Sequence, residues 1–494
     1  MPHGAMLQRL SQFENVWWSI GKGYMRGIAY DTARVSMLGN GNRFPRALLW
    51  ILTNQKKNGS WGEEVLHLQD RAVSTLSCVL ALKMANKPAY KSLIDRGLEY
   101  LNSISSYLRY ESCSMVGFEL IYPRLIDDAE EIGLDVSQAD IKWLRRAVEL
   151  KLRSLNIAYL AYIPNTTFPF SLEFLGPKLD RTRAQRLIGE NGSVLSSPSA
   201  TAFLLTHLKV RRSMNYLKSV QNLNRDGSIV NVYPFDVFER AWALFNHMLT
   251  GRDLTDIMYG NLRQLQDSWT RFGVGIAAKS PLRDSDDTAV AFKVLSTYGF
   301  TPDPVVFEQY ERDDKFLCFH LERDASVSAN IHILDAIKSC TNYPRRDAVV
   351  DKIIKFLVKQ AIEGCYWKDK WHLSPYYATS HAVLAIADLD QSIVGKAVDW
   401  IARTQNPDGS WGVLPNAEET AYALQALLFY QKFEKSHQDN IAAGLRYIAN
   451  LNPATYSYPA LWVGKGLYAP ENVIKSVVLS ALHLGHRFQQ GGAG

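Results

Sequence analysis

Cysteine is scarce and scattered in this sequence. Its 494 residues include five cysteines, an odd number, and no Cys-x-x-Cys pair. Separated cysteines of this kind argue against a disulfide framework or a structural zinc site, and they fit a reducing compartment. Residues 1–11 also lack the apolar core of a secretory signal. We therefore expect a cytoplasmic protein.

Long hydrophobic runs and blocks of one charge are also missing. No apolar stretch approaches the roughly 20 residues of a membrane-spanning helix, although a peripheral membrane contact stays compatible with the sequence. The net charge is +6, from 55 basic and 49 acidic residues, without a basic block. Nucleic acid is therefore not expected as a partner. The chain is 47% hydrophobic and 21% charged, which is typical of a folded globular protein.

Strand-like alternation is rare, and apolar residues recur mostly at helical spacing, as in residues 70–84 and 420–430. A turn also recurs. Residues 55–62 and 405–412 have the same spacing from Gln to Trp, and residues 221–228 hold a degenerate copy without the Trp. Glycine permits the positive φ that such turns need. The repeat predicts stacked helix pairs closed into toroids, with Gln bonded to backbone and Trp filling the seam between helices.

The sharpest chemical feature is the acidic cluster Asp-Ser-Asp-Asp at residues 284–287, directly before an apolar run. Acidic residues at this place are common helix N-caps, but a cap needs only one acceptor. Three carboxylates within four residues repel one another unless one keeps its proton. A protonated Asp aimed into a dry apolar cavity would be the strong acid that protonation of an isolated alkene requires. The pattern fits a cap and it fits a Brønsted acid.

The sequence around these features resembles the class II diterpene cyclases, which include bacterial halimadienyl and copalyl diphosphate synthases. The resemblance runs over nearly the whole chain, and its blocks occur in the family's order. They are residues 29–33, 58–62, 70–71, 116–119, 171–173, 192–193 with 196–199, 233–240, 284–287, 369–371 and 418–422.

This resemblance implies an all-α fold of two α/α toroids (barrels), the βγ architecture of the family. The γ domain is inserted after the first β helix, and the substrate lies between the two domains. Residues 1–20 then form the first helix of the β domain, residues 21–211 the γ domain, and residues 212–494 the rest of the β domain with the Asp-Ser-Asp-Asp motif.

The resemblance also implies a reaction. A linear polyprenyl substrate similar to geranylgeranyl diphosphate would be protonated and cyclised to a bicyclic or polycyclic terpenoid without loss of the head group. Asp286, the middle Asp of the motif, would protonate the terminal alkene, while Asp284 and Asp287 hold its environment. His332 matches the family's downstream His or Asn that bonds the acid. The nearest string to the class I motif Asp-Asp-x-x-Asp is residues 127–131, which we interpret as a solvated helix face.

Head group and metal stay open at this point. Arg96 matches a basic position assigned to diphosphate binding in the family. Relatives that use a diphosphate carry several acidic residues, associated with Mg2+, shortly before the block at 116–119. Here residues 107–113 retain only Glu111. Mg2+ is therefore an undecided cofactor, and Glu111 is its one candidate ligand.

Carbocations formed during cyclisation can be stabilised by aromatic faces, which are poor nucleophiles. The chain has 12 Trp, 24 Tyr and 20 Phe. We expect most of these residues to pack in the hydrophobic core. The candidate cavity liners are Trp242, Trp367, Trp371, Tyr376 and Tyr377.

Three alternatives remain. Within the same class, the substrate could be a prenylated aromatic acid, which yields a meroterpenoid; the sparse acidic stretch favours this reading, while Arg96 favours a diphosphate. On the same architecture, a protein prenyltransferase subunit would need zinc ligands, and no persuasive set is present. A non-catalytic helical scaffold would explain the repeated turns but not the ordered blocks.

Overall fold

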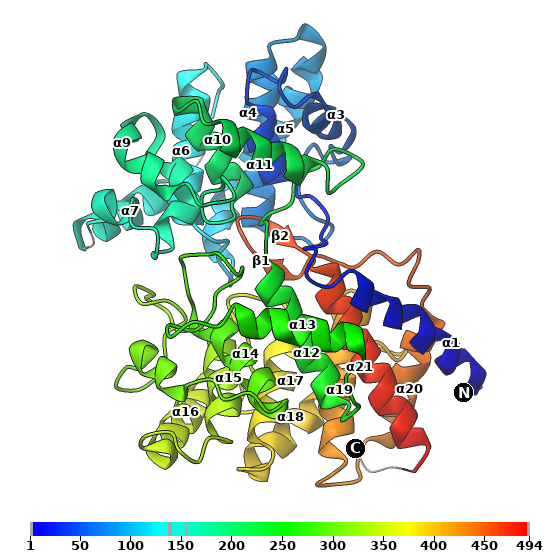
Figure 1. The fold of residues 1–494 in the computed structure, drawn as a ribbon. Coiled ribbons are helices and arrows are strands. Elements are labelled where there is room, and N and C mark those ends of the chain that lie inside the picture. The colour runs from blue at the N-terminus through cyan, green and yellow to red at the C-terminus, as the bar shows by residue number, and fades with distance from the viewer. Residues whose placement is uncertain (1–2, 137–140, 155, 492–494) are drawn as a thin grey trace.

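The computed structural model of the chain describes residues 3–136, 141–154 and 156–491. In these residues the structure is almost entirely helical, as the apolar spacing predicts. Its described sheet is a single short hairpin, in which β1 (Trp462–Val463) pairs antiparallel with β2 (Leu467–Tyr468). Figure 1 shows the helices in two groups, one above the other, with the hairpin between them.

The lower group of Figure 1 is a closed helical ring. Each inner helix packs against the next, and the last packs against the first. Around the ring these helices are α12 (Asp236–Leu249), α14 (Ser285–Thr297), α15 (Val327–Ile337), α17 (Pro375–Ile386), α19 (Ala417–Tyr430) and α21 (Glu471–Gln489). An outer layer covers them, formed by α1 (His3–Glu14), η1 (Asn15–Trp18), α13 (Asp256–Asp267), η6 (Pro304–Tyr310), α16 (Arg346–Gln360), α18 (Gln391–Arg403) and α20 (Gln438–Asn450).

The upper group is a second, smaller ring. Its inner elements close in the same way and are α2 (Ala29–Ser36), α4 (Leu68–Ala85), α6 (Phe118–Glu131), η4 (Phe168–Lys178) and α10 (Pro198–His207). Outside them lie α3 (Pro45–Thr53), η2 (Pro88–Tyr90), α5 (Lys91–Ile104), η3 (Ser105–Tyr110), α7 (Lys142–Ser154), α8 (Ile157–Leu160), α9 (Arg181–Ala184), η5 (Gln185–Leu187) and α11 (Arg211–Gln221). The fold is therefore the two-toroid, all-α architecture that the resemblance implies.

The segment between the rings lies further along the chain than the predicted limit at residue 211. α11 begins at Arg211 and packs against α10 of the upper ring. The backbone of Ile229 then bridges to Ile28, just before α2. Residues 208–210, just before the predicted limit, form the turn from α10 into α11, an outer helix of the upper ring.

The repeated turns join outer to inner helices, as their sequence predicts. Gly59 and Gly409 both have φ +87°, and a Cβ at Gly59 would lie 2.4 Å from the Arg96 carbonyl oxygen. Gln55 Nε2 donates to the carbonyl oxygens of Gly59 and Leu93 at 2.8 and 2.9 Å. The indole of Trp61 is fully buried, and its Nε1 donates to the Ile51 carbonyl oxygen at 2.9 Å. Each turn thus links three segments at one seam.

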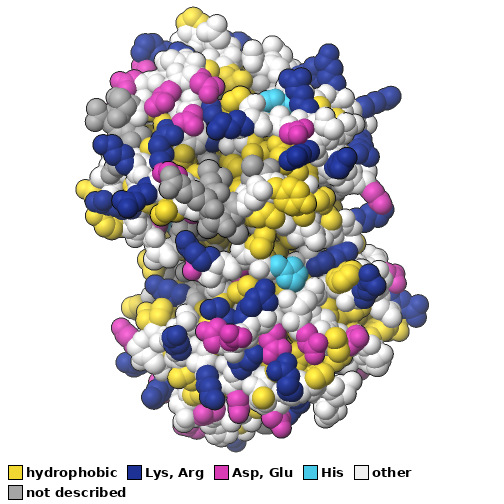
Figure 2. Space-filling view, turned by 90° about the vertical axis from the view of Figure 1, so that its left-hand side faces the viewer, with side chains coloured by type: hydrophobic (Ala, Val, Ile, Leu, Met, Phe, Trp, Pro, Cys, Tyr) yellow, Lys and Arg dark blue, Asp and Glu magenta, His cyan; other side chains and the backbone are white. Residues whose placement is uncertain are grey.

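The surface mixes both signs of charge. Figure 2 shows basic and acidic side chains interspersed over both rings on one face, with a constriction at the level where the rings meet. No helix among the described residues is both long and apolar enough to cross a membrane.

Candidate active site

The acidic cluster forms the start of an inner helix of the lower ring. Asp284 is the N-cap of α14: its backbone is extended (φ −140°, ψ 162°), and its carboxylate oxygen accepts from the Asp287 N–H at 2.7 Å. Ser285 anchors the turn, because its Oγ and N–H donate to the carbonyl oxygens of Leu317 and Cys318, in the loop before α15, at 2.9 and 3.0 Å. One Asp therefore caps the helix and leaves Asp286 free for another task.

Burial keeps protons in this cluster. It raises the pKa of Asp284 to about 7, against the hydrogen bond from Asp287 and with the help of the neighbouring Asp286 charge. It also raises the pKa of Asp287 well above its usual range, and the nearby Asp284 charge adds to this shift. At neutral pH the cluster therefore does not carry three full negative charges.

His332 lies against Asp286, on the next inner helix α15. Its Nδ1 is 2.5 Å from Asp286 Oδ1, and both side chains are buried, with 3% and 9% of their surfaces exposed. α15 begins at its N-cap Ser326, whose Oγ accepts from the Ala329 N–H. The contact between Asp286 and His332 is the one expected from the resemblance.

A second histidine continues this chain. His381, on α17, places its Nδ1 2.6 Å from Nε2 of His332. Sequence analysis did not find it, because His381 belongs to no recognised motif and meets His332 only when α15 and α17 pack side by side. The only signal in the sequence was that His381 lies within the mostly apolar helix α17.

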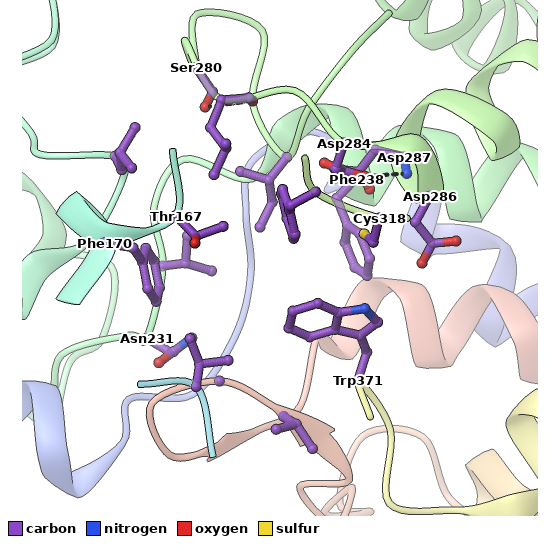
Figure 3. Close-up of a pocket in the computed structure, with 18 of the residues that line it drawn as sticks. Thr167, Phe170, Asn231, Phe238, Ser280, Asp284, Asp286, Asp287, Cys318 and Trp371 are labelled. Atoms are coloured by element: carbon purple, nitrogen blue, oxygen red, sulfur yellow. Dashed lines mark hydrogen bonds between the residues drawn. The ribbon is translucent and has the colours of Figure 1, made fainter. Parts of the chain in front are cut away.

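Asp286 lines an elongated apolar pocket that lies between the two rings. The space within it is about 1010 Å³, part of which is open to solvent. Figure 3 shows the acidic cluster at one end and Thr167, Phe170, Asn231 and Ser280 at the other. Its walls also contain Val116, Leu195, Val232, Phe238, Ile276, Leu282, Cys318, Phe319, Trp371, Trp462, Val463, Gly464 and Tyr468.

The predicted aromatic liners divide into three groups. Trp371 lies on the pocket wall below the acidic cluster (Figure 3). Trp242 and Tyr377 lie behind that wall and pack edge-on against His332, with ring centroids 5.8 and 6.3 Å apart. Tyr376 lies away from the pocket and packs on Trp400, at a centroid distance of 5.0 Å. Trp242, Tyr377 and Tyr376 are therefore not among the residues that line the pocket, and Tyr376 is turned away from it because its side of α17 faces the outer helix α18.

Trp367 is also not a liner. It is fully buried, its N–H donates to Thr379 Oγ1 at 3.0 Å, and its Nε1 donates to the Leu357 carbonyl oxygen at 2.8 Å. Trp61 makes the same two bonds, to Thr75 Oγ1 and to the Ile51 carbonyl oxygen. Trp367 is therefore a further copy of the seam-filling Trp of the repeated turns.

Arg96 is not part of the pocket either. It lies exposed on α5, an outer helix of the upper ring, where its guanidinium donates to Gln55 Oε1. Its carbonyl group is the close neighbour of Gly59 in the repeated turn. The structure therefore gives Arg96 a place in the turn, and it does not support the predicted contact with a diphosphate.

Glu111 does not form a magnesium site with its neighbours. Its Oε1 accepts from the Leu68 N–H at 2.6 Å, and its Oε2 is 3.5 Å from Nε2 of His67. The carboxylate thus caps α4, and no group of three His, Cys, Asp or Glu among the described residues is arranged to hold a metal ion. A requirement for Mg2+ therefore stays a prediction.

The acidic string at residues 127–131 lies at the end of α6, where Asp127 and Asp128 are half-buried and Glu130 and Glu131 are exposed. Asp128 and Glu131 bind the guanidinium of Arg124 at 2.6 and 2.7 Å. Asp127 binds Arg145 on α7 at 2.6 Å. Three of its four carboxylates are therefore engaged in ion pairs.

Several pocket residues were not predicted individually. Asn231 precedes the recognised block at 233–240, so its neighbourhood was a usable signal. Phe170 precedes the block at 171–173 in the same way. Trp462 and Tyr468 come from the β1–β2 hairpin, whose position between the rings no local sequence pattern reveals.

The arrangement combines a buried carboxylic acid, a histidine on one of its oxygens, and a long apolar space lined by aromatic rings. An acid in such a dry space can protonate a very weak base, and the aromatic walls can stabilise a cation without capturing it. Fold and site together define a protonation-initiated isoprenoid cyclase.

Known proteins agree with this class. Residues 322–448 match the family described as squalene-hopene cyclase C-terminal domain. The chain is 34% identical to the type B diterpene cyclase of Mycobacterium tuberculosis, over 94% of this chain and 97% of that protein. It is 32% identical to the syn-copalyl diphosphate synthase of Oryza sativa subsp. japonica over 72% of this chain, although it spans only 48% of that longer protein.

Among solved structures, the ent-copalyl diphosphate synthase from Streptomyces platensis superposes with a TM-score of 0.80 at 28% identity, over 97% of this chain and 99% of that one. The chain belongs to the class II terpene cyclase family. It is an enzyme that starts cyclisation of a linear isoprenoid by protonation.

Proposed function

We propose that the chain cyclises a linear C20 isoprenoid diphosphate, geranylgeranyl diphosphate, to a bicyclic or polycyclic product that keeps its diphosphate, with Asp286 as the acid. The observation that carries this proposal is the Asp286 carboxyl group, which is held on one oxygen by His332 at one end of an apolar pocket. The names of the relatives, a diterpene cyclase and copalyl diphosphate synthases, support the C20 chain and the retained diphosphate.

The proposed reaction begins with transfer of the Asp286 proton to the terminal carbon–carbon double bond. The π electrons form the new C–H bond, and the adjacent carbon becomes a tertiary cation. Internal double bonds attack this cation in turn and close the rings, while Phe238, Trp371 and Trp462 offer aromatic faces along the wall. Loss of a proton or addition of water ends the sequence. Asp286, now a carboxylate, keeps its hydrogen bond with His332.

The proposed head-group position is the other end of the pocket. Thr167, Asn231 and Ser280 offer polar groups along that side of the pocket, away from the acidic cluster (Figure 3). A linear substrate whose alkene terminus reaches Asp286 directs its head group toward this end. In this orientation only the terminal double bond of the substrate lies within reach of the Asp286 proton.

A prenylated aromatic acid is the second candidate substrate. It is favoured by one observation: the described pocket wall contains no Lys or Arg. A single carboxylate needs fewer cationic contacts than a diphosphate does. Both candidates use the same acid and differ only in the head group.

Mass spectrometry of products from a panel of linear substrates tests the proposal. We expect geranylgeranyl diphosphate to give a cyclic product that still carries the diphosphate. Each substrate is incubated with and without EDTA, because the magnesium requirement stays a prediction. If Mg2+ accompanies the diphosphate, EDTA lowers its turnover and leaves that of an aromatic acid unchanged. Cyclisation of the aromatic acid alone would replace the proposed substrate and leave Asp286 as the acid.

A further inference from the structure

The hydrogen-bonded chain behind Asp286 does not stop at His332. His332 Nε2 lies 2.6 Å from Nδ1 of His381, so the three side chains form a line from the pocket into the core of the lower ring. His381 is 2% exposed, and its own Nε2 has no hydrogen-bond partner among the described residues. It is therefore joined to the site through a single nitrogen.

The groups around His381 leave it uncharged. Rings of Phe245, Tyr377 and Tyr422 enclose it, with centroids 5.5, 4.7 and 5.8 Å from the imidazole. Burial lowers the pKa of His381 well below its usual value, and the nearby His332 and His372 lower it further. A neutral imidazole carries one N–H, either on Nδ1 or on Nε2.

The two tautomers have opposite consequences for Asp286. If His381 carries its proton on Nδ1, it donates to His332 Nε2, and His332 must carry its own proton on Nδ1 and donate to Asp286 Oδ1. The acid proton of Asp286 is then on its other oxygen. If His381 is protonated on Nε2, His332 donates backward to it and turns a lone pair toward Asp286.

Only the first arrangement survives the reaction. After Asp286 loses its proton, the first tautomer still has an N–H donating to Oδ1. In the second, a carboxylate oxygen and an imidazole lone pair would face each other across 2.5 Å, which is repulsive. The first tautomer also blocks protonation of His332 at Nε2, and so keeps the proton on Asp286 rather than on the histidine.

Resting on Asp286 as the acid of the proposed function, we infer that His381 is a positioning residue: it donates from Nδ1 to His332 and thereby fixes the tautomer that holds Asp286 ready to protonate the substrate. Which nitrogen of a histidine carries its proton is commonly set by the hydrogen bond that the other nitrogen makes. His381 touches neither the substrate pocket nor Asp286; it acts only through His332.

Two variants of His381 separate its hydrogen bond from its packing. His381→Phe keeps a planar ring and removes the donor. We expect kcat to fall about 10–100-fold, the loss typical of removing a hydrogen-bond partner that orients a metal-binding histidine, with KM little changed. His381→Asn places an amide N–H near the position of Nδ1 and should recover much of this loss. Ser380→Ala is the matched control: it alters the neighbouring buried side chain, whose Oγ has no hydrogen-bond partner among the described residues, and should leave kcat and its pH profile unchanged.

The tautomer itself can be read without substrate by 15N NMR of the full chain labelled at histidine. We expect His332 to be protonated on Nδ1 in the unmodified protein and to lose this preference in His381→Phe. A His332 protonated on Nε2, or a folded His381→Phe with unchanged kcat and pH profile, would overturn the inference. An active Asp286→Asn variant would instead overturn the assigned acid, so the two failures are distinguishable.

Discussion

At the scale of single residues, three similar side chains in one helical turn have different tasks. Asp284 caps α14, Asp287 is held near it, and Asp286 meets His332. Sequence singled out Asp286 through the Asp-Ser-Asp-Asp block, and His332 through its match to the family's downstream His or Asn position. It did not find His381, since an acid–histidine–histidine line depends on which faces of α15 and α17 meet. Spacing along the chain does not contain that information.

The rate should depend on the protonation of Asp284, whose pKa burial raises to about 7. Below that pH Asp284 is neutral; above it, Asp284 carries a negative charge, and this charge opposes the loss of a proton from the neighbouring Asp286. We therefore expect kcat to fall as pH rises through about 7. Steady-state kinetics over pH 5.5–8.5 measure this.

Asp284→Asn is the matched variant for this prediction. Asparagine caps a helix as well as aspartate does, so the fold should be kept, but it cannot ionise. The decline near pH 7 should move or disappear in the variant. An identical pH profile in both proteins would assign the decline to another group.

At the scale of elements, the repeated turn is a structural device with one tryptophan per seam. Sequence predicted this for Trp61 and Trp411, where the Gln-to-Trp spacing is identical. Trp367 escaped notice because the distance from Gln360 is one residue longer. Its hydrogen bonds to Thr379 and Leu357 nevertheless match those of the other copies. Hydrogen-bond geometry identified the repeat where spacing did not.

Removal of either of two tryptophans that are close in sequence should therefore affect a different property, stability for one and catalysis for the other. Trp367→Ala should lower the free energy of unfolding by about 3–5 kcal/mol, because it empties a fully buried site. Trp371→Ala should cost less stability and change kcat or the product mixture, since Trp371 lies on the pocket wall. Denaturant unfolding and product analysis of both variants test this. Native stability with altered products in Trp367→Ala would contradict the structural role.

At the scale of the whole molecule, the site exists only where the two rings meet. Thr167 and Phe170 come from the upper ring, and Asp286 and Trp371 from the lower one. Lys465, between β1 and β2, helps to join them: its buried Nζ donates to Glu173, Ser197 and Ser199 of the upper ring at 2.7, 2.8 and 2.7 Å. The relative position of the rings therefore shapes the pocket.

This dependence explains what sequence could predict. Ordered blocks such as residues 284–287 and 418–422 were sufficient for the two-toroid fold and for choosing Asp286 as the candidate acid. They were not sufficient for Arg96, Tyr376 and Trp367, because lining a cavity is a property of facing surfaces. A residue on an inner helix can face the pocket, an outer helix or a seam between helices. Aromatic residues occur in all three positions, so the residue type alone does not show which one a side chain takes.

The most direct test of the account is the turnover of the Asp286→Asn variant. An amide keeps the shape of the carboxyl group but cannot donate a proton to an alkene, and a general acid contributes about 10²–10⁴ in rate. The account predicts a variant with unchanged melting temperature and at least this loss of cyclised product from geranylgeranyl diphosphate, measured by mass spectrometry against the unmodified enzyme. Near-unmodified turnover by a folded Asp286→Asn protein would contradict it.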